Sequence, residues 1–200
     1  MNPVATHPFA ERTNINPEEI LTLPYGSFRG KITLVQKPSD VKKAVNRISA
    51  QPILGFDTET RPSFKKGQTF KVAILQLATA EQAWLFRLHH TGLPPELQEL
   101  LQDHSTIKCG VAIRDDLKAL QKVSPFEPGG FVELAALSKQ KGLEVEGLRK
   151  LAAILLGIRI SKSAQTTNWE SKILTSKQIE YAATDAWACL EIYRKLQERP

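Results

Sequence analysis

One stretch, residues 51 to 60, constrains the fold of this 200-residue chain most strongly, because an apolar run there ends in two acids. Leu54 and Phe56 are typical of a central strand that is covered on both faces. Side chains two positions apart on a strand point to the same side, so we expect Asp57 and Glu59 to converge at its carboxyl end. Buried carboxylates are costly without a partner, and two oxygen ligands on a rigid backbone suit a hard cation.

The same two acids also have a simpler interpretation. An Asp-x-Glu pattern at a strand end is often a polar exit into a loop or a helix cap, without any catalytic role. The positions of the other acids in the chain decide between these two interpretations.

Periodic apolar patterns on both sides of this strand predict an α/β fold. The predicted strands cover residues 31–36, 72–78, 83–88 and 106–112, and the predicted helices begin near residues 39, 94, 114, 147 and 175. Two of these strands are close enough in sequence for a hairpin, whereas helices separate the others, so the sheet should be mixed. Residues 131–137 are apolar, but their periodicity does not distinguish a helix from a strand.

The N-terminal region differs from the rest of the chain. Residues 1 to 23 contain three prolines and no sustained apolar period, which predicts a loosely ordered tail with a short helical turn at Pro17. Residues 24 to 200 are enough for one sizeable domain, since 42% of the chain is hydrophobic. We therefore expect a tail followed by one domain.

Composition argues against several classes of protein. No apolar run reaches membrane-spanning length and the N-terminus lacks the order of a secretory signal, so we expect a cytoplasmic protein without a membrane partner. Cys109 and Cys189 lie far apart in apolar contexts, which predicts reduced thiols and neither a zinc site nor a disulfide. The formal net charge of +6 is compatible with a polyanionic partner but is only a weak indication of one.

The last predicted helix places Tyr181 beside Asp185. A spacing of four residues makes the phenol and the carboxylate neighbours on one helical face. Ala182 and Cys189 belong to the adjacent apolar stripe, so Asp185 lies at the edge of the face that should pack on the sheet. The alternative is an exposed acid near the start of the helix, and the helix pattern alone leaves both possibilities open.

Two consecutive acids, Asp115 and Asp116, compete for one role in the helix after residue 112. Asp116 shares a helical face with Leu120, which should point to the core. Asp115 shares the opposite face with Lys118, where a surface ion pair would contribute little to stability. Helical phase therefore favours Asp116 as the functional acid.

Three motifs together resemble those of the tyrosine-type DEDD 3′–5′ exonucleases. They are the run from Phe56 to Thr60, Gly110 followed by Asp116, and the Tyr-Ala-Ala-Thr-Asp run that ends at Asp185. Trp84-Leu-Phe and Asn168-Trp169 make the Werner-type exonuclease domain the most similar member, with ribonuclease D next. The resemblance covers roughly residues 28 to 196 and implies a ribonuclease-H-like fold, a mixed sheet flanked by helices.

The resemblance also implies a reaction. Asp57, Glu59, Asp116 and Asp185 would hold two divalent cations, Mg²⁺ or Mn²⁺, with Asp57 touching both. Such a pair of cations can support in-line attack of water on a phosphodiester at the 3′ end, which releases nucleoside 5′-monophosphates. Tyr181 would orient that water or help to deprotonate it.

Substrate contacts are expected from two loops that flank the acids. The loop after Glu59 offers Thr60, Arg61, Phe64 and Lys65, and the loop near residues 161–169 offers Lys162 and Trp169. Basic and aromatic residues together can follow phosphates and stack a terminal base. In the alternative interpretation, Phe64 and Trp169 only pin their loops to the core.

Two questions stay open at the level of sequence. A catalytically silent nucleic-acid-binding or interaction module on the same fold is the alternative to an exonuclease, although all five predicted catalytic residues are present. The choice between DNA and RNA is also open, because contacts that ignore the base can serve both. A separate helicase or recruiting protein is an expected partner, and the oligomeric state cannot be deduced from the sequence.

Overall fold

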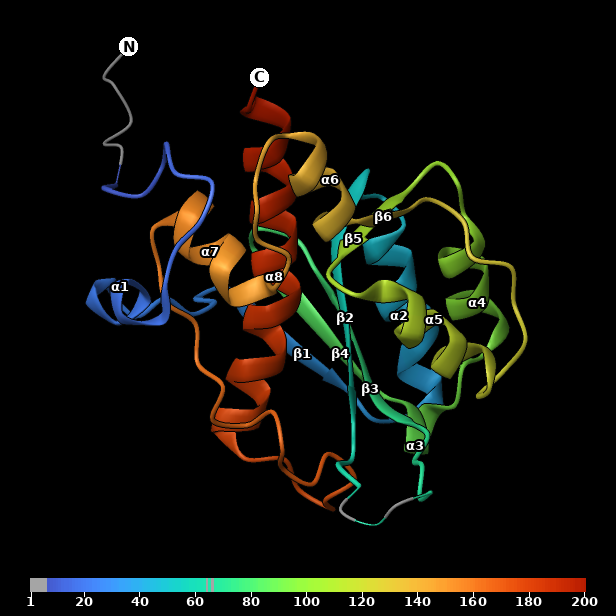
Figure 1. Ribbon diagram of the computed structural model, residues 1–200. Helices are drawn as coiled ribbons and strands as arrows, with labels where there is room; N and C mark the ends of the chain where they lie inside the picture. The colour runs from blue at the N-terminus through green and yellow to red at the C-terminus, as the bar shows by residue number, and fades with distance from the viewer. Residues whose placement is uncertain (1–6, 64, 66) are drawn as a thin grey trace.

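The computed structural model describes residues 7 to 63, 65 and 67 to 200 (Figure 1). Phe64, one of the predicted substrate contacts, therefore lies outside the described residues. The centre of the fold is a six-stranded sheet with helices on both faces. The predicted α/β fold with a mixed sheet flanked by helices is confirmed.

The sheet has the strand order β1-β4-β3-β2-β5-β6, which places β2 in its interior. The strands are β1 (Lys31–Val35), β2 (Ile53–Thr60), β3 (Val72–Ala78), β4 (Gln82–Arg87), β5 (Ile107–Gly110) and β6 (Phe131–Glu133). β3 is antiparallel to β2 and β4, and the other neighbouring pairs are parallel. The predicted hairpin is confirmed, and the segment of undecided type is β6 followed by α6 (Leu134–Gln140).

Two groups of helices cover the two faces of the sheet (Figure 1). One face packs against α2 (Pro38–Ile48), α3 (Leu88–Thr91), α4 (Pro95–Gln102) and α5 (Ile113–Gln121). The other face packs against α8 (Ser176–Glu198), with α6 and α7 (Leu148–Leu156) beside α8. Successive residues of β2 serve the two faces, because Leu54 and Phe56 join the core under the first group whereas Gly55 contacts α8.

The backbone of α8 lies directly against β2 at Gly55. A Cβ atom at this position would overlap the carbonyl oxygen of Ala186. The helix surface that faces the sheet is made of small residues such as Ala182 and Ala186, both fully buried. Because Asp57 follows Gly55 by two residues and Asp185 precedes Ala186, this contact brings acids from distant parts of the chain together.

α8 is 23 residues long and begins as the sequence predicts. Thr175 and Gln178 form a capping box, in which each side chain accepts a hydrogen bond from the backbone amide of the other residue. The predicted apolar stripe, including Cys189, is buried. No helix in the described part of the chain is both long enough and apolar enough to cross a membrane.

Part of the N-terminal segment packs onto the domain. It contains α1 (Pro17–Thr22), which starts with a capping box between Asn16 and Glu19. Ile15, Ile20 and Leu23 are buried in the same apolar cluster as residues of α7. The predicted helical turn is present, but a loosely ordered tail does not describe residues 15 to 23, because their few apolar side chains cover α7.

We predict that Gly55→Ala destabilises the protein. Overpacking of a close contact costs about 1–3 kcal/mol, which corresponds to a fall in Tm of about 3–10 °C for a domain of this size. Thermal unfolding followed by circular dichroism measures the change. Gly147→Ala is the matched control, because Gly147 has a φ of −85° and a Cβ there would meet no heavy atom of the described residues within 4 Å. Equal Tm values for the two variants would contradict the prediction.

Candidate active site

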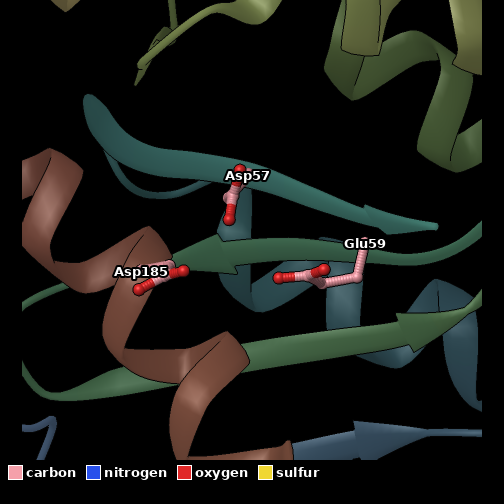
Figure 2. Close-up of side chains that lie close together, drawn as sticks. All are labelled: Asp57, Glu59 and Asp185. Carbon is pink, nitrogen blue, oxygen red and sulfur yellow. The ribbon is translucent and has the colours of Figure 1, made fainter. Parts of the chain in front are cut away.

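Three carboxylates meet at the carboxyl end of β2. Asp57 and Glu59 come from the strand and Asp185 comes from α8, and one oxygen atom of each lies within 4.8 Å of the others. Figure 2 shows the three side chains pointing toward one another. Glu59 and Asp185 are buried and Asp57 is partly buried. The predicted convergence of Asp57 and Glu59 on one side of the strand is present in the structure.

The fourth predicted acid, Asp116, approaches from the first turn of α5. Thr58, which lies between the two strand acids, donates a hydrogen bond from Oγ1 to Asp116 Oδ1 over 2.6 Å. Asp116 is not in the 4.8 Å cluster, but in addition to the larger effect of burial its charge raises the pKa values of Asp57 and Glu59. Asp116 therefore borders the same site.

The neighbouring acid, Asp115, points to solvent. Its side chain is 93% exposed, and its carboxylate lies 3.7 Å from Lys118 Nζ. This is the surface pair that helical phase predicts. The two consecutive acids thus lie in opposite environments, one beside the strand acids and one in water.

Glu133 at the end of β6 holds the turn that leads into α5. Its carboxylate accepts hydrogen bonds from the backbone amides of Ala112 (3.0 Å), Ile113 (2.9 Å) and Ala135 (3.1 Å). Ala112 has a φ of 59°, a conformation that is costly for a residue with a Cβ. The carboxylate stabilises this turn and so fixes the start of the helix that carries Asp116. Sequence reasoning missed Glu133, whose only signal was an acid between an apolar run and a helix.

Burial raises the pKa values of the four acids, and the charges of neighbouring acids add to this effect at Asp57 and Glu59. The pKa of Asp57 lies well above its usual range because of burial and the charges of Asp185 and Asp116. Burial and repulsion raise the pKa of Glu59 to about 10, and burial raises the pKa values of Asp116 and Asp185 to about 6 and about 7. Within the described residues, no Lys or Arg forms an ion pair with any of these acids. Protons or cations must therefore balance their charge.

The donor set fits a divalent cation. All candidate ligand atoms are carboxylate oxygens, which hard cations prefer. Three of them already lie within reach of a common point, since they are within 4.8 Å of one another. A bound cation would remove the repulsion that otherwise keeps these acids protonated.

Tyr181 lies one helical turn before Asp185 on α8, and its phenol lowers the pKa of the Asp185 carboxyl against the larger effect of burial. Burial, together with the charges of Asp185 and Glu59, raises the pKa of the Tyr181 phenol above its usual range. The hydroxyl is therefore protonated at neutral pH and can donate a hydrogen bond. The ring of Trp169 packs beside Tyr181, with the ring centroids 6.0 Å apart.

Trp169 cannot stack on a substrate base as one interpretation of the sequence suggested. Its side chain is fully buried, so a base has no access to either face of the ring. The structure favours the alternative, in which Trp169 pins its loop to the core and supports Tyr181. Burial of this kind depends on packing between the loop and α8, which sequence periodicity does not report.

Asp57, Glu59 and Asp185 line a cleft of about 860 Å³, whereas Asp116 is not part of the lining. Three basic residues share its lining with them, namely Arg149, Lys150 and Lys162. Lys162 is a predicted substrate contact that the structure brings to the acids. Arg149 and Lys150 were missed, although two consecutive basic residues in the first turn of α7 were a signal that phosphate groups could be attracted there.

Among the described residues that line this cleft, Thr60, Arg61 and Lys65 do not occur. Thr60 is partly buried at the end of β2, where the pairing with β3 is irregular. Arg61 lies 3.3 Å from Glu170 and stacks over the ring of Phe70, and Lys65 is exposed in the same loop. Their roles as substrate contacts stay predictions.

Comparisons with known proteins agree with this geometry. A family model described as 3′–5′ exonuclease matches residues 32–199. The bifunctional 3′–5′ exonuclease/ATP-dependent helicase WRN of Mus musculus is 35% identical over 184 residues, which cover 87% of this chain and 13% of that protein. A 3′–5′ exonuclease of Arabidopsis thaliana is 30% identical over 193 residues, which cover 88% of this chain and 67% of that protein. The chain thus spans only a small part of the WRN protein.

Solved structures show the same fold. The EXO domain of Aedes aegypti Nibbler superposes with a TM-score of 0.79 at 23% identity, covering 87% of this chain and 92% of that one. Escherichia coli RNase D, described as an exoribonuclease involved in structured RNA processing, gives a TM-score of 0.76 at 24% identity. The match covers 84% of this chain and 45% of that chain. Trypanosoma brucei RNase D in complex with RNA U12 gives a TM-score of 0.73 at 20% identity, and the match covers 84% of this chain and 63% of that chain. The ribonuclease-H-like fold implied by the sequence is confirmed.

We predict that the acids make the metal-free protein less stable as the pH rises from about 5 to about 8. Their folded-state pKa values are raised, so the folded protein keeps protons that the unfolded chain has already released. Denaturant unfolding in EDTA at several pH values measures the slope of the free energy of unfolding against pH. A divalent cation added at about pH 8 should restore the lost free energy of unfolding, because it balances the charge of the acids in place of the protons.

The control is Asp185→Asn. Because this variant lacks one of the acids with a raised pKa, its free energy of unfolding should fall less steeply with pH than that of the wild type. Burial lowers the pKa values of His7 and His89, so these two histidines make the protein more stable as the pH rises, which is opposite to the effect of the acids. These histidines are unchanged in the variant, so their contribution cancels in the difference. Identical slopes in the two proteins would contradict the prediction.

Proposed function

The chain belongs to the 3′–5′ exonuclease family, and from this premise we propose that it hydrolyses phosphodiester bonds at the 3′ end of nucleic acids. The products would be nucleoside 5′-monophosphates. We propose two divalent cations, Mg²⁺ or Mn²⁺, as cofactors, which Asp57, Glu59, Asp116 and Asp185 would hold. When bound, the cations would stabilise the negative charge that develops at phosphorus and on the leaving 3′ oxygen.

The observation that carries this proposal is the group of four acids without a basic partner among the described residues. Their arrangement opposes folding, because charged carboxylates at partly or fully buried positions repel one another. A module that only bound nucleic acid would gain affinity from basic residues and nothing from these acids. A cation-dependent reaction on phosphate explains why the site contains them.

Tyr181 is proposed to orient the attacking water. Its phenol is protonated at neutral pH in the absence of cations, so its first role is as a hydrogen-bond donor rather than as a base. The packing of Trp169 against Tyr181 holds the ring in position. Tyr181 can therefore place a water or a phosphate oxygen without changing its own position.

The basic residues of the cleft are proposed to hold the phosphates of the strand. Arg149, Lys150 and Lys162 line the same cleft as the acids, so a strand end that reaches the acids passes near them. Such contacts read no base, so they are compatible with a DNA strand and with an RNA strand. A helicase or recruiting protein is a proposed partner, since the related WRN protein combines an exonuclease with a helicase.

We predict that Asp116→Asn lowers the rate of 3′ shortening by at least about 100-fold, since even loss of a group that only supports a metal ligand costs 10–100-fold. The measurement uses 5′-labelled DNA and RNA strands, single and duplex, with Mg²⁺, Mn²⁺ or EDTA. Asp115→Asn removes the adjacent charge from the solvent side of the same helix and should keep the wild-type rate. Shortening that survives both EDTA and Asp57→Asn would refute the proposed function, as would no shortening of any substrate.

We also predict that Lys162→Gln weakens binding of a single strand and makes it less dependent on salt. Loss of one phosphate contact should reduce the slope of log Kd against log salt concentration by about 0.7. Fluorescence anisotropy of a labelled strand with the inactive Asp116→Asn protein measures binding without cleavage. Lys118→Gln removes the same charge from the exposed face of α5 and serves as the control. Equal slopes for the two lysine variants would show that Lys162 contacts no phosphate.

A further inference from the structure

The side chain of Gln76 on β3 is fully buried, and neither of its polar atoms has a hydrogen-bond partner among the described residues. Its exposure is 0%, and both Oε1 and Nε2 are unpartnered within the described structure. Most buried polar side-chain atoms in proteins are paired, because an unpaired one loses its hydrogen bonds to water without replacement. The presence of a buried Gln76 amide with both polar atoms unpaired therefore requires an explanation.

The register of the sheet places Gln76 beside the acids. Its Cα partner on β2 is Asp57, and its Cα partner on β4 is Leu85. Directly opposed residues of antiparallel strands have side chains on the same face, with Cβ atoms about 4.5–5.5 Å apart. Ile74 and Ala78, two residues to either side of Gln76, pack with α8 residues, so the amide also lies on the face covered by α8.

We propose that Gln76 is a positioning residue for Asp57. Its Nε2 group donates a hydrogen bond to the Asp57 carboxylate when this carboxylate is ionised and turned toward a bound cation. The inference rests on the proposed function, because it requires a cation at the acids. Hydrogen bonds to an ionised acceptor are stronger than those between neutral groups, so the amide would hold Asp57 firmly in the orientation that binds the cation.

A purely structural role does not explain an amide at this position. The flanking residues on β3, Leu75 and Leu77, are apolar and fully buried, and an unbranched apolar side chain would fill the same space without unpaired atoms. The free energy lost by burying the amide is therefore recovered only when a partner forms. The Asp57 carboxylate is the ionisable group directly opposite it on the neighbouring strand.

Replacement of Gln76 by methionine tests this inference through two opposite effects. Gln76→Met should raise the Tm of the metal-free protein, because the side chain keeps its length and loses its unpaired polar atoms. The same substitution should weaken Mn²⁺ binding about tenfold or more, because Asp57 loses its hydrogen bond. Thermal unfolding in EDTA and isothermal titration calorimetry with MnCl₂ measure the two effects without reference to enzymatic activity.

Leu85→Met is the matched control. It places the same side chain on the other strand next to β3, one strand farther from Asp57. This variant should bind Mn²⁺ with the wild-type Kd. An unchanged Kd in Gln76→Met would overturn the inference, and so would an equal loss of affinity in Leu85→Met.

A second measurement follows the amide itself. In ¹⁵N-labelled protein, the side-chain amide signal of Gln76, assigned by its absence in Gln76→Glu, should move downfield when Mg²⁺ is added. A signal that does not move in protein that binds Mg²⁺ would overturn the inference. A wild-type protein that binds neither cation would instead refute the proposed function, so the two failures are distinguishable.

Discussion

The contact between α8 and β2 at Gly55 determines the geometry of the candidate active site. The absence of a Cβ atom there lets the carbonyl oxygen of Ala186 lie against the strand. Asp185 precedes this contact on the helix and Asp57 follows it on the strand, so their separation is set by backbone packing. A site built in this way is rigid, because neither acid can move away without separating the longest helix from the centre of the sheet.

The rest of the fold compensates for the free energy that is lost by bringing these acids together. Burial raises the pKa values of the acids, and within the described residues no basic side chain neutralises them. Polar contacts hold Asp116 nevertheless, since Thr58 donates a hydrogen bond to it and Glu133 anchors the start of its helix. The free energy lost at the site is balanced by the large apolar clusters on both faces of the sheet.

Acids and basic residues occupy one cleft but have different tasks. The acids suit cations and the reacting phosphate, whereas Lys162, Arg149 and Lys150 suit the phosphates of a bound strand. Aromatic support comes from inside the protein, because Trp169 is buried beside Tyr181. The membership of the 3′–5′ exonuclease family and this division of roles are consistent with each other.

The sequence alone determined the features that local geometry controls. Alternation along β2 predicted that Asp57 and Glu59 share a side, and helical phase distinguished Asp116 from the exposed Asp115. Only the tertiary structure decided which distant segments meet. It showed that Trp169 is buried and not available to a base, and that Ile20 and its neighbours pack on the domain. It also showed that Gln76 pairs with Asp57 across the sheet and that Glu133 holds the start of the helix that carries Asp116. These features depend on packing between segments far apart in the chain, and the period of a single strand or helix carries no information about its partners.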